Sequence, residues 1–191
     1  MKYKNSYNIL DKFIAYLRFR EVLKKNDFDG KKIIDFGSGS NFDVLKKRYS
    51  KTKKAIFIDK HGYPFKNNQF SFLKYEDKIN ELENDLKNEK FDIILMCAVI
   101  EHLDNPENIF NFLKNYLNKN GYFFITAPSK FSKPLLEFLG FKLGIINKFL
   151  LAEHKRYYNL DAYEELATRT NLKLINFKYF ECMMNTSAIL K

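Results

Sequence analysis

The sequence predicts an α/β protein with a doubly wound, mostly parallel sheet of seven strands, the last of which is antiparallel. Three observations support this fold class. Short runs of β-branched and aromatic residues alternate along the chain with segments that carry apolar residues at helical spacing. A glycine-rich stretch, DFGSGSN at residues 35–41, follows the first such run directly. The last two runs have so short a connection that they can pair only as antiparallel neighbours.

The predicted strands are short runs rich in Ile, Leu, Phe and Tyr. They cover residues 32–36, 54–59, 69–75, 91–98, 122–127, 172–180 and 183–190. The run FDIILMCA at 91–98 is almost entirely apolar, which is typical of a strand that is buried on both faces. The strand pattern therefore favours a sheet that is covered by helices on both sides.

The predicted helices separate these strands. They cover residues 8–25, 42–49, 77–88 and 160–169. A further helix begins at Pro106, with Asn105 as its expected cap, and is expected to end at Asn120 and Gly121. No internal repeat or linker divides the chain, so residues 1–191 are predicted to form one domain. A leading helix lies within residues 1–29, and an insertion at 132–157 precedes the last helix.

The composition narrows the class of protein. The chain of 191 residues is 46% hydrophobic and has only two cysteines, too few for a disulfide framework. It has neither a signal-peptide pattern nor a run of about 20 apolar residues, so a cytoplasmic protein without a transmembrane segment is predicted. The net charge of +10 would suit RNA or an anionic membrane surface. The lysines are scattered, however, and the abundance of Lys, Asn, Phe, Ile and Tyr equally indicates a compositional bias.

The loop at residues 35–41 lies where a doubly wound sheet binds its ligand, beyond the carboxyl end of a strand. A phosphate-binding loop would need a Lys followed by Ser or Thr, and none follows Asn41. A dinucleotide site needs a small residue three positions beyond Gly39, where this chain has Phe42. Gly37 and Gly39 still allow a ligand to approach the backbone closely, so a third kind of ligand is favoured.

This loop resembles motif I of the class I S-adenosylmethionine-dependent methyltransferases, in which an acidic residue precedes Gly-x-Gly-x-Gly. Asp35, Gly37 and Gly39 match it, and Asn41 stands in place of the third glycine. Since Asn tolerates positive φ better than other non-glycine residues, the turn is expected to be kept. The resemblance implies a Rossmann-like methyltransferase fold and S-adenosyl-L-methionine as co-substrate. Asp35 would engage the amino group of the methionine moiety, with Ser38 also in the donor-binding loop.

Further donor-binding residues follow from the same resemblance. Asp59 ends the second predicted strand and is expected to accept hydrogen bonds from the ribose hydroxyls. Asp77, next to Glu76, stands where an acidic residue contacts the adenine amino group in many members of the family. Ala98, at the end of the fourth predicted strand, completes the expected donor-binding set.

A second stretch, residues 91–130, resembles the small-molecule and lipid branch of these enzymes. The matching residues are Phe91, Asp92, Glu101, His102, Leu103, Pro106, Gly121 and Pro128. Together with motif I, the resemblance covers roughly residues 30–180. Loops typical of methylation at a nucleobase amine or at C5 of a base are missing, so methyl transfer to an oxygen is favoured.

Methyl transfer to a hydroxyl requires alignment of the acceptor and a group that accepts its proton. His102 and His154 are the candidate bases, because neutral imidazole is available near pH 7, and Glu101 adjoins His102. Arg156 and Tyr157 follow His154 in HKRYY and are expected to face the acceptor, where Arg156 could pair with an anionic group. The apolar insertion at 132–157 could line an acceptor pocket or rest on a membrane surface.

The predicted function is therefore O-methylation of a small molecule, a lipid-linked intermediate or a cell-surface glycan precursor. One alternative is a metal-assisted RNA 2′-O-methyltransferase, with Glu101, His102 and His154 as ligands. The related enzymes have another Glu three residues before Glu101, and Ala98 occupies that position here, so a metal is disfavoured. A second alternative is a protein that binds S-adenosylmethionine without catalysis. A nicotinamide oxidoreductase is disfavoured by Phe42.

Overall fold

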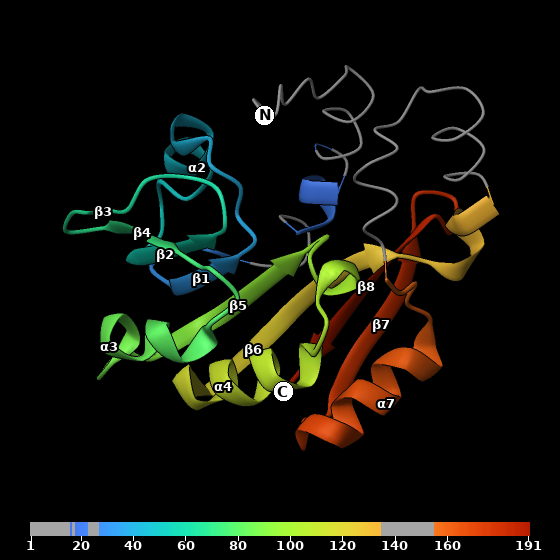
Figure 1. The fold of residues 1–191 in the computed structure, drawn as a ribbon. Helices are drawn as coiled ribbons and strands as arrows, with labels where there is room; N and C mark the ends of the chain where they lie inside the picture. The colour runs from blue at the N-terminus through green and yellow to red at the C-terminus, as the bar shows by residue number, and fades with distance from the viewer. Residues whose placement is uncertain (1–15, 17, 23–26, 135–154) are drawn as a thin grey trace, which may run out of the picture.

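The computed structural model of the chain is an eight-stranded sheet with helices on both faces (Figure 1). The structure describes residues 16, 18–22, 27–134 and 155–191. The strands lie in the order β3-β4-β2-β1-β5-β6-β8-β7. Their bounds are Lys32–Phe36 (β1), Lys54–Asp59 (β2), Phe65–Lys66 (β3), Phe70–Lys74 (β4), Phe91–Cys97 (β5), Leu117–Pro128 (β6), Leu174–Phe180 (β7) and Asn185–Leu190 (β8).

The pairing of the strands confirms the predicted fold class. Strands β4, β2, β1, β5 and β6 are mutually parallel, and β8 is antiparallel to both β6 and β7. The short strand β3 pairs antiparallel with β4 and was not predicted from the sequence. The ring centroid of its Phe65 lies 3.9 Å from that of Phe42, the first residue of helix α2 (Phe42–Arg48). Because that contact is long-range, a local sequence pattern could not reveal it.

Helices and short 3₁₀ turns connect the strands. They are α2 (Phe42–Arg48), η1 (Ile79–Leu82), α3 (Glu83–Leu86), η2 (Ile100–His102), α4 (Pro106–Leu113), η3 (Lys114–Tyr116), η4 (Lys130–Ser132) and α7 (Leu160–Thr170). The helix predicted at 77–88 is shorter than expected, because Asp77 and Asn88 both have φ of 63° and cannot belong to a right-handed helix. Of the predicted leading helix, the described residues 16 and 18–22 are helical.

Of the two boundaries predicted for α4, the first is confirmed and the second is wrong. The helix begins at Pro106 with Asn105 as its N-cap residue, although the Asn105 side chain makes no capping hydrogen bond. Asn120 and Gly121 do not end a helix, because β6 already begins at Leu117 and contains both. A Cβ atom at Gly121 would lie 2.7 Å from the carbonyl oxygen of Phe91, at the irregularity between β5 and β6. This glycine therefore allows the two strands to approach, rather than stopping a helix.

Each face of the sheet carries its own hydrophobic core. On one face Ile34 and Ile94 are fully buried beneath α3, α4 and α7. On the other face Leu95 packs with Leu45 of α2 and Val22 of the leading helical segment. Figure 1 shows α4 and α7 on one side of the sheet and α2 on the other. Alternate residues of every central strand are thus buried on opposite sides, which explains their nearly continuous apolar sequences.

The parallel strands β1, β2, β5 and β6 all end at one edge of the sheet. The connections that follow these strands contain most of the predicted site residues. Within the described part of the chain, no helix is long and apolar enough to cross a membrane.

Candidate active site

The loop after β1 brings two glycines to the carboxyl edge of the sheet. Gly37 has φ of 79° and Gly39 has φ of 74°, a region that side-chain-bearing residues rarely adopt. The amide of Gly37 donates to the carbonyl oxygen of Ile58 at 2.7 Å, which holds the loop against β2. A Cβ at Gly37 would lie 2.0 Å from Cγ2 of Val99, whereas a Cβ at Gly39 would meet nothing within 4 Å. Gly37 is thus needed for packing, and Gly39 leaves open space beside the backbone.

Asp59 fixes this loop to the end of β2. Its Oδ2 accepts a hydrogen bond from the Gly39 amide at 2.8 Å, and its Oδ1 accepts one from the His61 amide at 2.9 Å. Each carboxylate oxygen has a further lone pair, so the group can still accept hydrogen bonds from a ligand. The side chain therefore suits the predicted contact with ribose hydroxyls.

Asn41 has a different local role from the one predicted. Its φ is −83°, so it does not reproduce the left-handed conformation of a third glycine. Its side chain instead accepts a hydrogen bond from the Val44 amide at 3.3 Å and caps α2. Ser38 donates from Oγ to the carbonyl oxygen of Gly39 at 3.0 Å and stabilises the turn itself.

Asp35 is buried beside the loop. Its Oδ2 accepts a hydrogen bond from the Tyr49 hydroxyl at 2.6 Å, and this tyrosine directly follows α2. Burial raises the pKa of Asp35 to about 6, although the Tyr49 hydrogen bond and the charge of Arg48 lower it. Tyr49 was not predicted as a site residue. Nothing local in the sequence indicates that the residue after a helix is the hydrogen-bond partner of a carboxylate on a strand.

The raised pKa of Asp35 predicts a pH-dependent stability. The folded chain keeps the Asp35 proton up to about pH 6, whereas the unfolded chain loses it near the ordinary aspartate pKa of 3.8. Hence the contribution of this group to the free energy of unfolding falls as pH rises between about 4 and 6, by roughly 3 kcal/mol. We expect Asp35→Asn to flatten this part of the profile in urea unfolding at pH 4 to 7. A variant whose profile parallels that of the wild type would contradict the assignment.

Two further residues that were predicted to bind the methyl donor have positive φ angles. Asp77 has φ of 63° and its exposed carboxylate pairs with Lys60 at 2.8 Å. Ala98 has φ of 55°, and its amide donates to the carbonyl oxygen of Thr126 at 2.9 Å. The turn at Ala98 ends β5 and places Val99 against Gly37. Ala98 thereby connects the loops that follow β1 and β5.

Glu101 lies in the 3₁₀ turn η2, just after β5, and burial shifts the pKa of its side chain. Only 1% of the residue is exposed, and its Oε2 has no hydrogen-bond partner among the described residues. Burial raises the pKa of Glu101 to about 7, partly offset by the positive charge of Arg18. A buried carboxyl group with a pKa near 7 is suited to accept a proton at neutral pH. Its neighbour His102 is half-buried in the same turn.

The segment after the insertion returns to this turn. The amide of Lys155 donates to the carbonyl oxygen of Glu101 at 2.8 Å, and Arg156 donates from Nη2 to the carbonyl oxygen of Asp104 at 3.2 Å. The structure thus brings Arg156 to the loop that contains Glu101. Tyr157 is half-buried, with the Lys133 ammonium 5.9 Å from its ring centroid.

Two parts of the predicted site lie outside the described residues: the candidate base His154 and most of the 132–157 insertion. Sequence reasoning also missed two charged residues, Arg18 and Glu181. Arg18 lies on the leading helical segment, and its charge lowers the pKa of both Glu101 and Glu181. Helical periodicity could have placed Arg18 on one face of that helix, but not opposite these two carboxyl groups.

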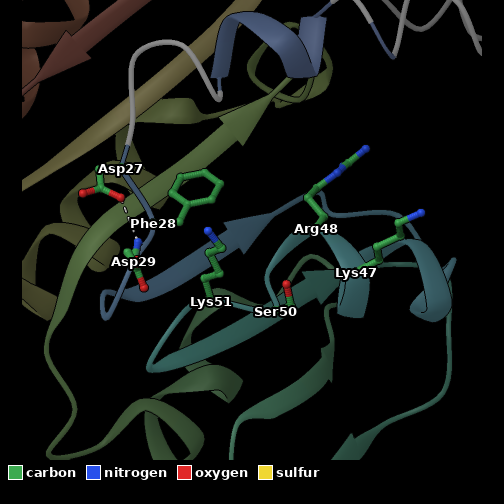
Figure 2. Close-up of a pocket in the computed structure, with 7 residues that line it drawn as sticks. All are labelled: Asp27, Phe28, Asp29, Lys47, Arg48, Ser50 and Lys51. Carbon is green, nitrogen blue, oxygen red and sulfur yellow. Dashed lines mark hydrogen bonds between the residues drawn. The ribbon is translucent and has the colours of Figure 1, made fainter.

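A surface hollow of about 340 Å³ lies at the other end of α2 (Figure 2). It is lined by Asp27, Phe28, Asp29, Lys47, Arg48, Ser50 and Lys51. The lining residues come from the last turn of α2 and the segments before β1 and β2, so the hollow lies away from the glycine loop that precedes α2. Its lysines and aspartates face solvent, and it contributes nothing to the site at the carboxyl edge.

The doubly wound sheet, the glycine loop after β1 and the acidic residue that ends β2 together define a class I S-adenosylmethionine-dependent methyltransferase. Residues 8–176 match the profile of the family described as "Methyltransferase domain". The chain belongs to this family. The class of enzyme and the co-substrate, S-adenosyl-L-methionine, are thus those predicted from the sequence.

The relatives agree with this family. A tRNA U34 carboxymethyltransferase from Campylobacter hominis is 28% identical over 134 residues, which are 64% of this chain and 46% of that protein. The chain thus spans less than half the length of that curated relative. A methyltransferase structure from Archaeoglobus fulgidus matches with a TM-score of 0.65 at 14% identity, over 94% of both chains. The pyocyanin biosynthetic protein PhzM matches with a TM-score of 0.66 at 13% identity, over 95% of this chain and 56% of that one.

Proposed function

We propose that the chain transfers the methyl group of S-adenosylmethionine to a hydroxyl oxygen of a small acceptor. The acceptor class is a small molecule, a lipid-linked intermediate or a glycan precursor. The observation that carries this proposal is Glu101, a carboxyl group just after β5 that is 1% exposed and whose Oε2 has no partner among the described residues. Such a group can take the acceptor proton as the new bond to carbon forms.

Several features favour the loop after β1 as the donor site. Open space beside Gly39 allows a ligand to reach the backbone, and the Asp59 carboxylate retains lone pairs for ribose hydroxyls. Asp35, Ser38, Asn41, Asp77 and Ala98 complete the proposed donor contacts. S-adenosylmethionine supplies an activated methyl group on a sulfonium centre, so the protein needs to contribute alignment and a base rather than further activation.

Two further roles are acceptance of the proton and binding of the acceptor. Glu101 is the proposed base, and its pKa of about 7 leaves much of it ionised at slightly alkaline pH. His102 lies in the same turn and is retained as a second candidate. Arg156 and Tyr157 are the proposed acceptor contacts, with Arg156 available for an anionic group on the acceptor. His154 remains a proposed site residue on sequence grounds alone.

A second candidate function is modification of RNA. It is favoured by the similarity to a tRNA U34 carboxymethyltransferase and by the net charge of +10. A metal-assisted variant of this chemistry would use Glu101, His102 and His154. Within the described residues, no group of three His, Cys, Asp or Glu side chains is arranged to hold a metal ion.

The role of Asp59 gives a first prediction for the donor site. In Asp59→Asn one of the two side-chain oxygens becomes an amide NH₂ and faces a backbone N–H, either that of Gly39 or that of His61. Since an unpaired pair of donors costs about 1–3 kcal/mol, we expect binding of S-adenosylhomocysteine to weaken by about 5- to 150-fold. Asp85→Asn is the matched control, because Asp85 is exposed on α3 and belongs to no proposed donor contact. Equal affinities for wild type and Asp59→Asn, measured by calorimetry, would contradict the role of Asp59.

The acceptor class is tested by following a labelled methyl group. The chain is incubated with methyl-labelled S-adenosylmethionine and a cell extract, with and without EDTA, and the products are separated into small-molecule, lipid, glycan, RNA and protein fractions. The proposal predicts label in the small-molecule, lipid or glycan fraction that survives EDTA. Label in RNA that EDTA abolishes would replace it with the metal-assisted RNA reaction.

A further inference from the structure

The face of the sheet that carries Leu95 and Phe124 becomes polar toward the carboxyl edge. On β6 the side chains on this face change from Phe124 to Thr126, and on β8 they change from Ile189 to Ser187. Thr126 and Ser187 are paired across the two strands and are 0% and 2% exposed. A buried polar surface at this position does not contribute to the hydrophobic core. It therefore indicates a site that binds a polar group.

The leading helical segment brings charge to this polar surface. Its Glu21 is 5% exposed and accepts a hydrogen bond from Lys178 of β7 at 3.4 Å, which attaches the segment to the sheet. Arg18 lies on the same segment, one helical turn away. Figure 1 shows this short helical piece beyond the end of β5, between α2 and the β7–β8 pair. The Ser129 hydrogen bonds hold the β7–β8 turn, which carries Glu181, at the end of β6, and the turn that carries Glu101 follows the neighbouring strand β5. The Arg18 charge acts on both Glu101 and Glu181, whose pKa values burial raises.

Glu181 stands in a strained turn. Glu181, Cys182 and Met183 have φ of 52°, 53° and 66°, a left-handed turn of three non-glycine residues between β7 and β8. Such a conformation is unfavourable for residues with a Cβ atom and persists only where surrounding contacts hold it. Ser129, which follows β6, supplies two of these contacts: its Oγ donates to the Met183 carbonyl oxygen and its amide donates to that of Met184 at 3.0 Å.

The polar atoms at the centre of this cluster lack partners. Nε of Arg18, Oε2 of Glu101 and Oε1 of Glu181 are buried and make no hydrogen bond within the described residues. A buried polar atom without a partner destabilises the fold, and native proteins rarely keep several together without a ligand or water. By contrast, the neighbouring Glu21 on the same helical segment is paired with Lys178.

We propose that Arg18 and Glu181 bind the acceptor beside Glu101, and that the acceptor presents at least two hydroxyl groups to them, as a sugar unit does. This inference rests on the proposed methyl transfer and specifies its acceptor. A hydroxyl group both donates and accepts hydrogen bonds, so it can donate to a carboxylate oxygen and accept from the Arg18 N–H. A single phenolic hydroxyl would leave two of the three buried atoms unpaired. Arg18 and Glu181 are thus specificity-determining residues, and Glu101 is the group that receives the proton.

The test compares Arg18→Gln and Glu181→Gln with Arg20→Gln, a control whose exposed side chain lies on the same helical segment. Each variant of the full chain is titrated with S-adenosylhomocysteine and assayed for methyl transfer from labelled S-adenosylmethionine. The acceptors are a set of simple methyl glycosides and a matched set of phenols. We expect label in at least one glycoside, with KM raised tenfold or more by Arg18→Gln and Glu181→Gln. The donor affinity of both variants should stay within twofold of wild type, and Arg20→Gln should leave KM unchanged.

Thermal unfolding provides a measurement that needs no acceptor. Because Arg18 and Glu181 contribute unpaired buried atoms, their Gln variants should unfold at the wild-type temperature or above it, as functional residues often do. Glu21→Gln breaks an existing ion pair and should unfold at a lower temperature. A clear loss of stability in Arg18→Gln and Glu181→Gln would show a structural ion cluster and overturn the inference.

The outcomes separate this inference from the proposed function. Label in phenols alone, or in a cell extract but in no glycoside, overturns the hydroxyl-rich acceptor and leaves methyl transfer intact. A wild-type chain that neither binds S-adenosylhomocysteine nor labels any extract overturns the proposed function itself.

Discussion

Replacement of Gly37 by Ala should abolish most of the affinity for the methyl donor. The added Cβ would lie 2.0 Å from Cγ2 of Val99, and the residue has φ of 79°. Steric displacement and left-handed strain together amount to about 2–3 kcal/mol, which corresponds to roughly 30- to 150-fold weaker binding. Calorimetric titration with S-adenosylhomocysteine measures this loss directly.

Three variants separate the causes of that loss. Gly39→Ala shares the positive φ but meets open space, so we expect only the strain, about 1 kcal/mol or about fivefold in affinity. Val99→Ala removes the atom that the new Cβ would strike, and combined with Gly37→Ala it should recover part of the lost affinity. Wild-type affinity in Gly37→Ala would show that the loop between β1 and α2 does not contact the donor.

The second large effect is expected for Glu101→Gln. Loss of the proton acceptor should lower kcat by about 10²- to 10⁴-fold while the donor affinity stays unchanged. In the wild type, kcat should rise with pH through about 7, because the base acts only when Glu101 is ionised and burial raises its pKa to about 7. The Gln variant should lose this rise. Steady-state rates between pH 5.5 and 9 measure both effects.

Glu107→Gln is the matched control, since Glu107 lies on α4 and its carboxylate pairs with Arg169 at 3.5 Å on the surface. It should keep wild-type kcat and the wild-type pH profile. If Glu101→Gln keeps its kcat and the profile, the proton acceptor is another group, and His102 is the next to test. Thermal unfolding of Glu101→Gln controls for folding, because Gln has the shape of the protonated side chain.

The strands that the sequence predicted correctly are those with local apolar patterns. The run FDIILMCA forms β5, and KIIDF forms β1, within one residue of the predicted bounds. Gly121 was misplaced because its role is a close contact with the Phe91 carbonyl oxygen on the neighbouring strand. Asn41 was assigned the backbone conformation of a glycine, but the requirement to cap α2 determined its φ instead.

The candidate site likewise contains residues that follow from local sequence patterns and residues that depend on long-range packing. The positions of Gly37, Gly39 and Asp59 follow from the order of strands and loops, and the structure brings them together at one edge. The pairing of Glu21 with Lys178, which brings the leading helical segment to the sheet, depends instead on how that segment packs on the far half of the sheet. Such contacts between residues more than a hundred positions apart leave no periodic signal in a single sequence.

The location of the donor is the central claim, and amide chemical shifts test it most directly. The ¹⁵N-labelled chain is titrated with S-adenosylhomocysteine, and the shift of each backbone amide is followed. We expect the largest chemical-shift changes at the carboxyl ends of β1, β2 and β5, on the amides of Gly37, Gly39, His61 and Ala98. Changes confined to the hollow between Asp27 and Lys51, or no saturable change at all, would contradict it.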